Sequence, residues 1–332
     1  MKRILFEKPG VVTFADDRRT PRDAFDKAEI VLRNAASIVS AGTELAILSG
    51  KESWAPLPYV PGYGSVGTIV EDRRPGGRDV GRLAFTYGTH SEYAAASVVT
   101  VEVPQGLAPA RAVFARMAAV AMTALRVSTI ELGDRVAVFG AGLVGNLATQ
   151  VCALSGARVI VVDTSRKRLE IVRRCGAEGT IVGDGDVVKE LRDVTGGAGC
   201  STVIEATGVP AVAPTAARCV ANQGELVLLG SPRGAFQTDL TGFLNTVHLC
   251  PAVVTVKGAH EWRFPVEPSG SGYPKHSIRR NVEIALGLIA SGKLKVDELM
   301  THRVKPDAAP EMYRGLRERA DDFLGVVFDW EA

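Results

Sequence analysis

Three glycines near the middle of the chain have the spacing of a phosphate-binding loop. Gly140, Gly142 and Gly145 form the pattern G-x-G-x-x-G directly after the apolar run Val136–Phe139. The first glycine permits a tight turn, the second lets a pyrophosphate approach the backbone, and the third lets a helix pack closely on the strand. The free N–H groups at the start of that helix would then face the phosphates. The pattern predicts a dinucleotide-binding loop.

A carboxylate follows the loop at a suitable place. Asp163 ends the next apolar run, where an acid about 20 residues on accepts hydrogen bonds from the adenosine ribose. A carboxylate there would repel a 2′-phosphate, so we expect NAD, with NADP less favoured. The cations Arg166, Lys167 and Arg168 follow closely and would favour a 2′-phosphate, and hence NADP. We interpret Arg166 and Lys167 as solvated helix charges and Arg168 as part of the adenine–ribose pocket. The residues expected to contact the dinucleotide are Gly140, Gly142, Leu143, Val144, Gly145, Asp163, Arg168, Ala206, Thr207 and Gly230.

Length, charge and cysteine usage narrow the class of protein. The 332 residues suffice for about two domains. The 39 Lys and Arg nearly balance the 37 Asp and Glu, which gives no electrostatic case for nucleic acid or an anionic membrane. Five cysteines without a C-x-x-C pattern fit a reducing compartment, and Glu7 interrupts any signal-peptide core. We expect a cytoplasmic protein with a small-molecule substrate.

The elements that must position these residues form two patterns. Residues 1 to about 105 read as short strands and turns, which predicts a β-rich domain. From a helix expected over 110–130, strands and helices then alternate, which predicts a parallel sheet. The expected strands are Lys2–Glu7, Glu29–Arg33, Gly67–Glu71, Leu83–Phe85, Val98–Val103, Val136–Phe139, Val159–Asp163, Thr180–Val182, Thr202–Ala206, Leu226–Gly230 and Val253–Val256. A Pro/Gly-rich loop over 263–274 and a helix over 279–291 complete this α/β reading.

The order of motifs resembles a known superfamily over essentially the whole chain. Ser40-Ala-Gly-Thr-Glu44 and Pro61-Gly-Tyr-Gly-Ser-Val-Gly67 precede the dinucleotide domain, and Ser291-Gly-Lys-Leu294 follows it. This resembles the medium-chain dehydrogenase/reductase superfamily, the relatives of zinc alcohol dehydrogenase. The resemblance implies a GroES-like catalytic domain of residues 1–121 and 276–332, a Rossmann NAD-binding domain of residues 122–275 inserted into it, and a cleft between them. It also implies a homodimer joined through Rossmann edge strands, at Val253–Val256.

The departures from the superfamily concern zinc. Zinc members usually read Cys-Gly-Thr-Asp where this chain reads Ala41-Gly-Thr-Glu44, and Gly-His-Glu where it reads Gly62-Tyr-Gly64. The third ligand would fall near residues 116–119, and no residue there can replace it. Catalytic zinc needs three protein ligands, and the four-cysteine structural lobe is also missing, so we predict a site with no metal. Both motifs are locally similar to a subgroup that includes bacteriochlorophyllide dehydrogenases.

Without zinc, side chains must handle the hydroxyl proton during hydride transfer. Tyr63 stands at the lost histidine ligand and is our candidate general acid/base; the alternative is that it only fills the metal cavity. Thr43 matches the superfamily position that relays the proton, or else caps a helix beginning at Glu44. His260 titrates near neutrality and would approach the nicotinamide, or is an ordinary loop residue. Lys51 and Trp54 lie in a loop that would border the substrate.

These observations predict a zinc-independent, NAD-dependent alcohol dehydrogenase or ketoreductase. We expect hydride transfer between the nicotinamide and a secondary alcohol or ketone of a polar metabolite, such as a sugar, a cyclitol or a specialised metabolite. One alternative is an NAD(P)H-dependent reductase of an activated C=C bond. Another is a non-catalytic NADH-binding protein, serving as a redox sensor or a structural subunit.

Overall fold

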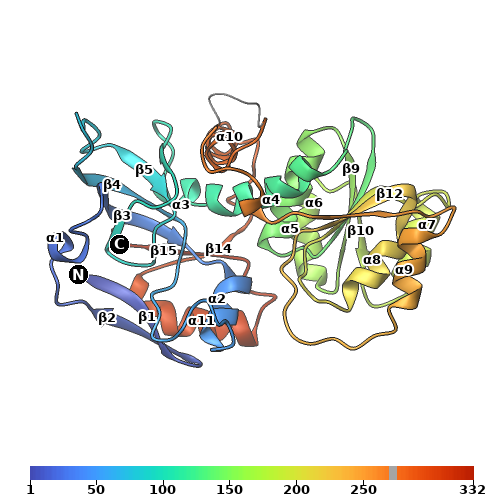
Figure 1. Ribbon diagram of the computed structural model, residues 1–332, viewed down its shortest axis with the longest axis horizontal. Coiled ribbons are helices and arrows are strands. Elements are labelled where there is room, and N and C mark those ends of the chain that lie inside the picture. Colours follow the sequence, from blue (N-terminus) through green and yellow to red (C-terminus); the bar gives the residue numbers. More distant parts are fainter. Residues whose placement is uncertain (269–274) are drawn as a thin grey trace. The chain divides into compact units, whose positions relative to one another are not determined.

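The computed structural model describes residues 1–268 and 275–332 (Figure 1). The chain forms two compact units, each described by itself below. Unit 1 consists of Met1–Arg116 and Pro265–Ala332, and unit 2 of Met117–Phe264. The superfamily resemblance had implied boundaries after residues 121 and 275, whereas the units meet after Arg116 and Phe264. Of the Pro/Gly-rich stretch over 263–274, residues 269–274 lie outside the described residues.

Unit 1 is rich in β-strands. Its elements are β1 (Lys2–Lys8), β2 (Val11–Asp16), α1 (Pro21–Ala24), β3 (Ile30–Ile38), α2 (Ala41–Leu48), β4 (Ser65–Asp72), β5 (Leu83–Thr86), β6 (Tyr93–Ala95), β7 (Thr100–Glu102), α3 (Pro109–Ala112), α10 (Ile278–Ala290), β14 (Met300–Val304), η2 (Pro306–Ala308), α11 (Ala309–Glu318) and β15 (Gly325–Asp329). The main sheet has the order β14-β15-β3-β4-β5-β7, with β6 also paired to β3. The strands β14 and β15 come from the end of the chain, so both segments of unit 1 build one sheet.

A hydrophobic core joins the two chain segments of unit 1. Phe6 of β1 meets Tyr313 of α11 edge to face, with ring centroids 4.9 Å apart. Ile47 of α2 and Phe328 of β15 lie fully or almost fully buried in the same cluster. Because α2 is packed into this core, the residues at its start have fixed positions, and these include the predicted site residue Thr43.

Unit 2 alternates strands and helices. Its elements, after α4 (Ala115–Val127) at the boundary, are β8 (Arg135–Phe139), α5 (Leu143–Leu154), β9 (Arg158–Asp163), α6 (Arg166–Cys175), β10 (Gly179–Val182), α7 (Val187–Val194), β11 (Cys200–Glu205), α8 (Val212–Arg218), β12 (Val220–Leu228), α9 (Thr241–His248), β13 (Thr255–Gly258) and η1 (Glu261–Arg263). The strands form one parallel sheet in the order β10-β9-β8-β11-β12-β13.

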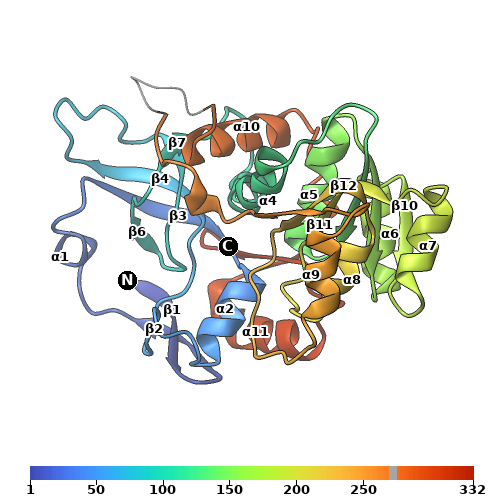
Figure 2. The ribbon, with the colours of Figure 1, turned by 45° about the vertical axis from the view of Figure 1, so that its right-hand side comes forward.

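The strand order of unit 2 reverses next to β8, which pairs with both β9 and β11. Right-handed crossovers then put α5 and α6 on one face of the sheet and the later helices on the other (Figure 2). Such a reversal leaves a crevice at the carboxyl ends of the two strands, where ligands bind in this architecture. The predicted α/β fold class, with a Rossmann sheet and a GroES-like unit, is confirmed.

Several predicted elements have other bounds in the structure, for example β3 and β12, which are longer than expected, and two of the differences have a clear cause. The helix expected over 110–130 is two helices, α3 and α4, interrupted at Val113 and Phe114, whose side chains are fully buried. The edge strand expected at Val253–Val256 is β13, Thr255–Gly258, because Val253 adopts a left-handed φ of 42° and belongs to the preceding turn. Among the described residues, no helix has both the length and the apolar character needed to cross a membrane.

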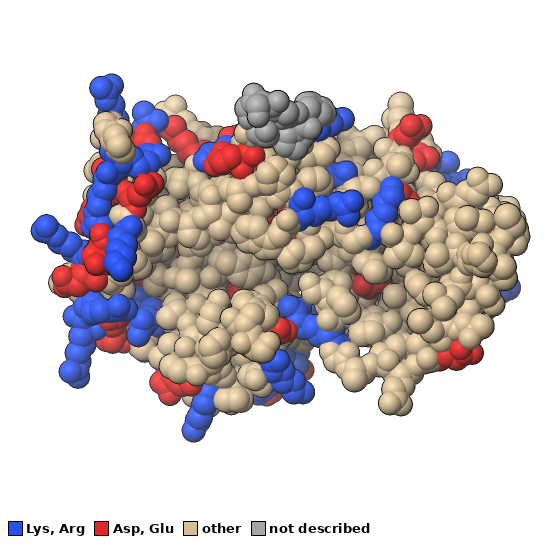
Figure 3. All heavy atoms as spheres, in the orientation of Figure 1, with Lys and Arg blue, Asp and Glu red and all other residues tan. Residues whose placement is uncertain are grey.

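Charge is distributed differently on the two units. On the face shown in Figure 3, Lys and Arg side chains gather over unit 1 with Asp and Glu beside them, whereas unit 2 shows mainly uncharged residues. Large apolar side chains are exposed around α9 and the start of β13: Phe236, Leu240, Leu244, Leu249, Val253 and Val256. An uncharged face with exposed apolar side chains is typical of a protein–protein contact.

Candidate functional site

The glycine loop of unit 2 has the close approach that its pattern predicts. Gly140 ends β8 with a φ of 100°, a left-handed conformation that favours glycine. A Cβ on Gly145 would lie 1.9 Å from the Gly140 carbonyl oxygen, so only glycine fits there. A Cβ on Gly142 would meet no atom within 4 Å, and this open space lies before the first turn of α5. Leu143 and Val144, both partly buried, begin that helix. The cradle therefore fits a pyrophosphate.

A second loop lies beside the glycine loop. Ala206 and Thr207 follow β11, and Thr207 Cγ2 would lie 3.0 Å from a Cβ on Gly140. The buried Glu205 carboxylate accepts a hydrogen bond from the Thr207 backbone N–H at 2.7 Å and also binds the Thr207 hydroxyl. Burial raises the pKa of Glu205, and the hydrogen bonds from Thr207 and Gly208 oppose this shift. Glu205 thus holds this loop in place. Gly230, the last residue predicted to contact the dinucleotide, follows β12 and packs closely against the same loop at Gly208.

Asp163 is tied to the same loop. Its Oδ2 accepts a hydrogen bond from the Ala141 N–H at 2.6 Å, and its Oδ1 accepts one from the Ser165 N–H at 2.7 Å. Arg168 is partly buried in the first turn of α6, and its N–H lies 3.4 Å from the cap residue Ser165. Both oxygens of Asp163 retain a second lone pair for a ribose hydroxyl. The neighbouring Arg166 contacts Asp184 at 3.2 Å on the surface.

In unit 1, three hydroxyl groups meet around Tyr63. The Tyr63 hydroxyl donates a hydrogen bond to Ser40 Oγ, and it lies 3.3 Å from Thr43 Oγ1. Burial raises the pKa of the Tyr63 phenol, while the Arg116 charge and the two hydroxyls lower it. The structure thus brings the predicted residues Tyr63 and Thr43 together, and it adds Ser40, which the sequence did not single out.

The start of α2 explains how Ser40 and Thr43 come to face Tyr63. The helix begins at Ala41 with Ser40 as its N-cap, so the alternative in which Thr43 caps a helix beginning at Glu44 is wrong. Glu44 reaches back and accepts the Ser40 backbone N–H at 2.8 Å. The Ser40 hydroxyl makes no capping hydrogen bond, which leaves it for Tyr63.

Behind Ser40 lies a buried polar network. The fully buried Glu44 accepts hydrogen bonds from the Tyr313 hydroxyl and, at 3.1 Å, from His90 Nε2. His90 Nδ1 lies 2.8 Å from Ser37 Oγ, which in turn accepts a bond from Trp330 Nε1 at 2.9 Å. With a proton on Nε2, the His90 ring can donate to Glu44 while Nδ1 accepts from the Ser37 hydroxyl. The ring of His90, which no sequence motif pointed to, thus anchors the carboxylate that fixes Ser40.

The second residue that sequence reasoning missed is Arg116. It is 2% exposed, and its guanidinium carbon lies 4.5 Å from the Tyr63 ring centroid and 4.1 Å from that of Tyr87. Its Nε donates a hydrogen bond to the Tyr63 carbonyl at 3.0 Å. A Cβ at position 64 would lie 2.7 Å from Arg116 Cγ, so Gly64 leaves the room for this side chain.

Zinc, which the superfamily usually carries, does not fit the donors present. Within the described ranges, no three His, Cys, Asp or Glu side chains are grouped to hold a metal ion. The positions compared above with the zinc motifs carry Ala41, Tyr63 and the cation Arg116. A fixed positive charge beside the site would repel a second cation.

The other residues predicted for catalysis or substrate binding make no hydrogen bond to the three hydroxyls of Tyr63, Ser40 and Thr43 in the described part of the chain. Lys51 is exposed, and Trp54, which is 59% exposed, donates to Glu52 at 2.7 Å in the loop after α2. His260 is exposed and precedes η1 in unit 2, whereas Tyr63 and Thr43 belong to unit 1. Their assignment to the substrate and to catalysis remains a prediction.

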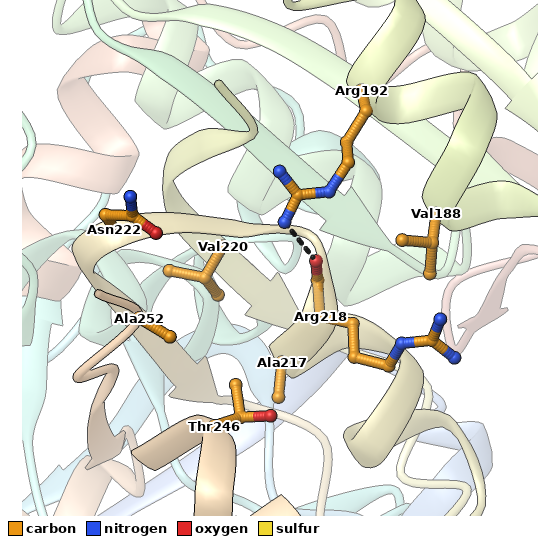
Figure 4. A pocket seen from close by; sticks show the side chains of 8 residues that line it. All are labelled: Val188, Arg192, Ala217, Arg218, Val220, Asn222, Thr246 and Ala252. Atoms are coloured by element: carbon orange, nitrogen blue, oxygen red, sulfur yellow. Dashed lines mark hydrogen bonds between the residues drawn. The ribbon is translucent and has the colours of Figure 1, made fainter. Parts of the chain in front are cut away.

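Unit 2 also has a cavity of about 250 Å³ (Figure 4). It is lined by Val188, Arg192, Ala217, Arg218, Val220, Asn222, Thr246 and Ala252. Arg192 donates to the Arg218 carbonyl at 3.1 Å. Val220 begins β12, so the cavity lies at the amino end of the parallel sheet, opposite the glycine loop. It is therefore not the dinucleotide site.

Comparisons with known proteins agree with this fold. The family model described as zinc-binding dehydrogenase matches residues 144–263. An alcohol dehydrogenase of Cupriavidus necator is 31% identical over 202 residues, which are 60% of this chain and 50% of that protein. A D-guloside 3-dehydrogenase of Shigella flexneri is 29% identical over 240 residues, 70% of this chain and 66% of the relative. The matches thus span about half to two thirds of these relatives.

Solved structures extend the likeness to the whole chain. Galactitol-1-phosphate dehydrogenase from Escherichia coli superposes with a TM-score of 0.83 at 18% identity, over 99% of this chain and 100% of that one. The reversed strand order, the glycine loop and the interrupted β-rich unit define the class of two-unit α/β dehydrogenases. The family model, the relatives and the shared fold support the medium-chain dehydrogenase/reductase superfamily that the motifs predicted.

Proposed function

We propose that the protein is a zinc-independent oxidoreductase that transfers a hydride between NAD and a secondary alcohol or ketone. The observation that carries this proposal is the Tyr63 hydroxyl, held by Ser40 and close to Thr43 beside a buried cation. A hydroxyl in such a group can give a proton to a carbonyl oxygen or take one from an alcohol. The names of the relatives, among them alcohol, guloside and galactitol-1-phosphate dehydrogenases, support a hydroxylated substrate.

In this proposal the two units divide the reaction. The glycine loop and Asp163 would hold NAD(H), which would supply the hydride for the carbonyl carbon in reduction and accept it in oxidation. As the C=O double bond becomes a single bond, Tyr63 donates its proton to the oxygen and an alcohol forms. Thr43 and Ser40 hold the phenol in place. The reverse oxidation returns the alcohol proton to Tyr63. Asp163 supports NAD over NADP, because its carboxylate would repel a 2′-phosphate where the ribose hydroxyl is accepted.

Solution state and location belong to the same proposal. The exposed apolar residues near β13 support a homodimer in which this edge strand meets its copy, so sedimentation velocity should give twice the 35.2 kDa chain mass. A monomer at micromolar concentration would contradict the dimer. The cysteines are free thiols, four of them buried, which supports a reducing compartment such as the cytoplasm.

The test is hydride exchange by the purified protein. NADH oxidation and NAD reduction are followed by absorbance with sugars, cyclitols and simple secondary alcohols or their ketones, in parallel with NADPH and NADP. We expect turnover with a polyhydroxylated member, faster with NAD than NADP and unchanged by a zinc chelator. No exchange with any carbonyl or alcohol overturns the proposal, and loss of activity on chelation with recovery on added zinc overturns zinc independence.

A further inference from the structure

Arg116 occupies an unusual place for a cation. A guanidinium usually lies at the surface, but this one is stacked between the rings of Tyr63 and Tyr87 and is 2% exposed. Arginine suits such a sandwich because its planar, weakly hydrated group stacks on aromatic faces and stays charged. The charge is therefore held against two phenol rings, one of which belongs to the candidate acid/base Tyr63.

The surroundings of Tyr63 show why a cation matters there. The pKa of Tyr63 is raised on balance: burial is the largest cause and the negative Glu44 adds to it, whereas Arg116 and the hydroxyls of Ser40 and Thr43 lower it in part. Tyr59 lies close enough to Tyr63 to interact electrostatically, and His90 faces Glu44 rather than the phenol. Of the charged groups named here that face Tyr63, Arg116 is the one that favours a phenolate.

We propose that Arg116 is a positioning residue that does the electrostatic work of a metal ion, orienting the Tyr63 ring and favouring its ionised form. The inference rests on the proposed function for its catalytic meaning, and on the observed contacts for its geometry. Arg116 is one of residues 116–119, near which the superfamily resemblance placed the third zinc ligand. In the oxidation direction, a phenolate at Tyr63 accepts the alcohol proton, and Arg116 balances the negative charge before that transfer.

The experiment reads the ionisation of Tyr63 without any turnover. A stopped-flow pH jump records tyrosinate absorbance before alkaline unfolding begins. Because the chain has six tyrosines, the Tyr63 transition is obtained as the difference from Tyr63→Phe in the same background. We expect Arg116→Met to move this transition up by about one pH unit or more, as removal of a close opposite charge does. Arg116→Lys should restore most of the shift.

The matched control is Arg111→Met, which removes a guanidinium paired with Asp297 at 3.1 Å in the same unit and should leave the transition in place. Tyr87→Leu, which removes one face of the sandwich, should give a smaller upward shift and decides the matter if Arg116→Met does not fold. A transition unmoved in the folded variants overturns the inference. Since no substrate is used, failure of the proposed function would not mimic this result; if the enzyme turns over, Arg116→Met should lower kcat more than it changes KM.

Discussion

The glycine loop of unit 2 is built differently from the cluster of Tyr63, Ser40, Thr43 and Arg116 in unit 1, the Tyr63 group. The loop is made by the backbone: Gly145 touches the Gly140 carbonyl, and free N–H groups open α5. The Tyr63 group is made by side chains from α2, from the residues before β4 and from α4. Backbone sites depend on a few glycines and resist substitution, whereas side-chain sites can exchange one chemistry for another in the same fold.

The largest effect is expected at the side-chain site. Tyr63→Phe removes the hydroxyl and keeps the ring on Arg116, so the fold should persist. We expect kcat to fall by about 10²- to 10⁴-fold, the range for loss of a general acid/base, with NADH binding unchanged. Steady-state kinetics and NADH fluorescence titration measure the two quantities. Tyr93→Phe, at a partly buried tyrosine of β6, serves as the control and should keep its rate.

The comparison would break if Tyr63→Phe retained full activity with the identified substrate. The hydroxyl would then fill space only, as the alternative interpretation of Tyr63 holds. A loss of NADH affinity in the same variant would show that cofactor binding depends on the Tyr63 group as well as on the glycine loop.

The features that could be predicted from the sequence differ between the backbone site and the side-chain site. Glycine spacing and strand–helix alternation are local signals, and they predicted the parallel sheet of unit 2 and a glycine turn after β8. The assignment of this loop and of Asp163 to a dinucleotide stays a prediction. Arg116 and His90 were not predicted as members of the site because their roles depend on partners far along the chain. Glu44, for instance, binds the hydroxyl of Tyr313, which no local pattern connects to it.

Local reasoning also failed where tertiary contacts decide the backbone. The alternative that placed the helix cap at Thr43 is wrong because the helix begins earlier, at Ala41, and Glu44 accepts the backbone N–H of the N-cap residue Ser40. The apolar residues before β13 suggested strand, yet Val253 turns because the following residue, Val254, bonds back to Thr246.

A matched glycine pair sharpens the backbone side of the comparison. Gly145→Ala would force a Cβ to within 1.9 Å of the Gly140 carbonyl oxygen, so the strand and α5 must separate. We expect the free energy of unfolding to drop by about 1–3 kcal/mol, the cost of overpacking, with NADH binding lost as well. Thermal melts and isothermal titration calorimetry give these values.

Gly142→Ala is the partner of that variant. Its Cβ would meet open space and its φ of −65° suits alanine, so stability should stay near that of the natural chain. NADH affinity should still fall, because the methyl stands where the pyrophosphate approaches. If both variants lost stability equally, or if Gly142→Ala bound NADH normally, the assignment of this loop to the dinucleotide would be wrong.

The smallest effect is expected at Asp163, where a side chain serves the backbone site. Asp163→Asn keeps the shape but loses the charge and one acceptor oxygen, so it can accept only one of the two backbone bonds from Ala141 and Ser165. NADH should bind less tightly and NADPH more tightly, since a neutral amide no longer repels a 2′-phosphate and Arg166 and Lys167 lie nearby. We expect the ratio of the two dissociation constants to change roughly tenfold, equivalent to about 1.4 kcal/mol. Fluorescence titration with both nucleotides measures it, and Glu178→Gln, an exposed carboxylate paired with Arg158, should leave the ratio unchanged. An unaltered ratio in Asp163→Asn would mean that the Asp163 side chain does not set the choice between NAD and NADP. The dinucleotide site would then depend on the loop backbone alone.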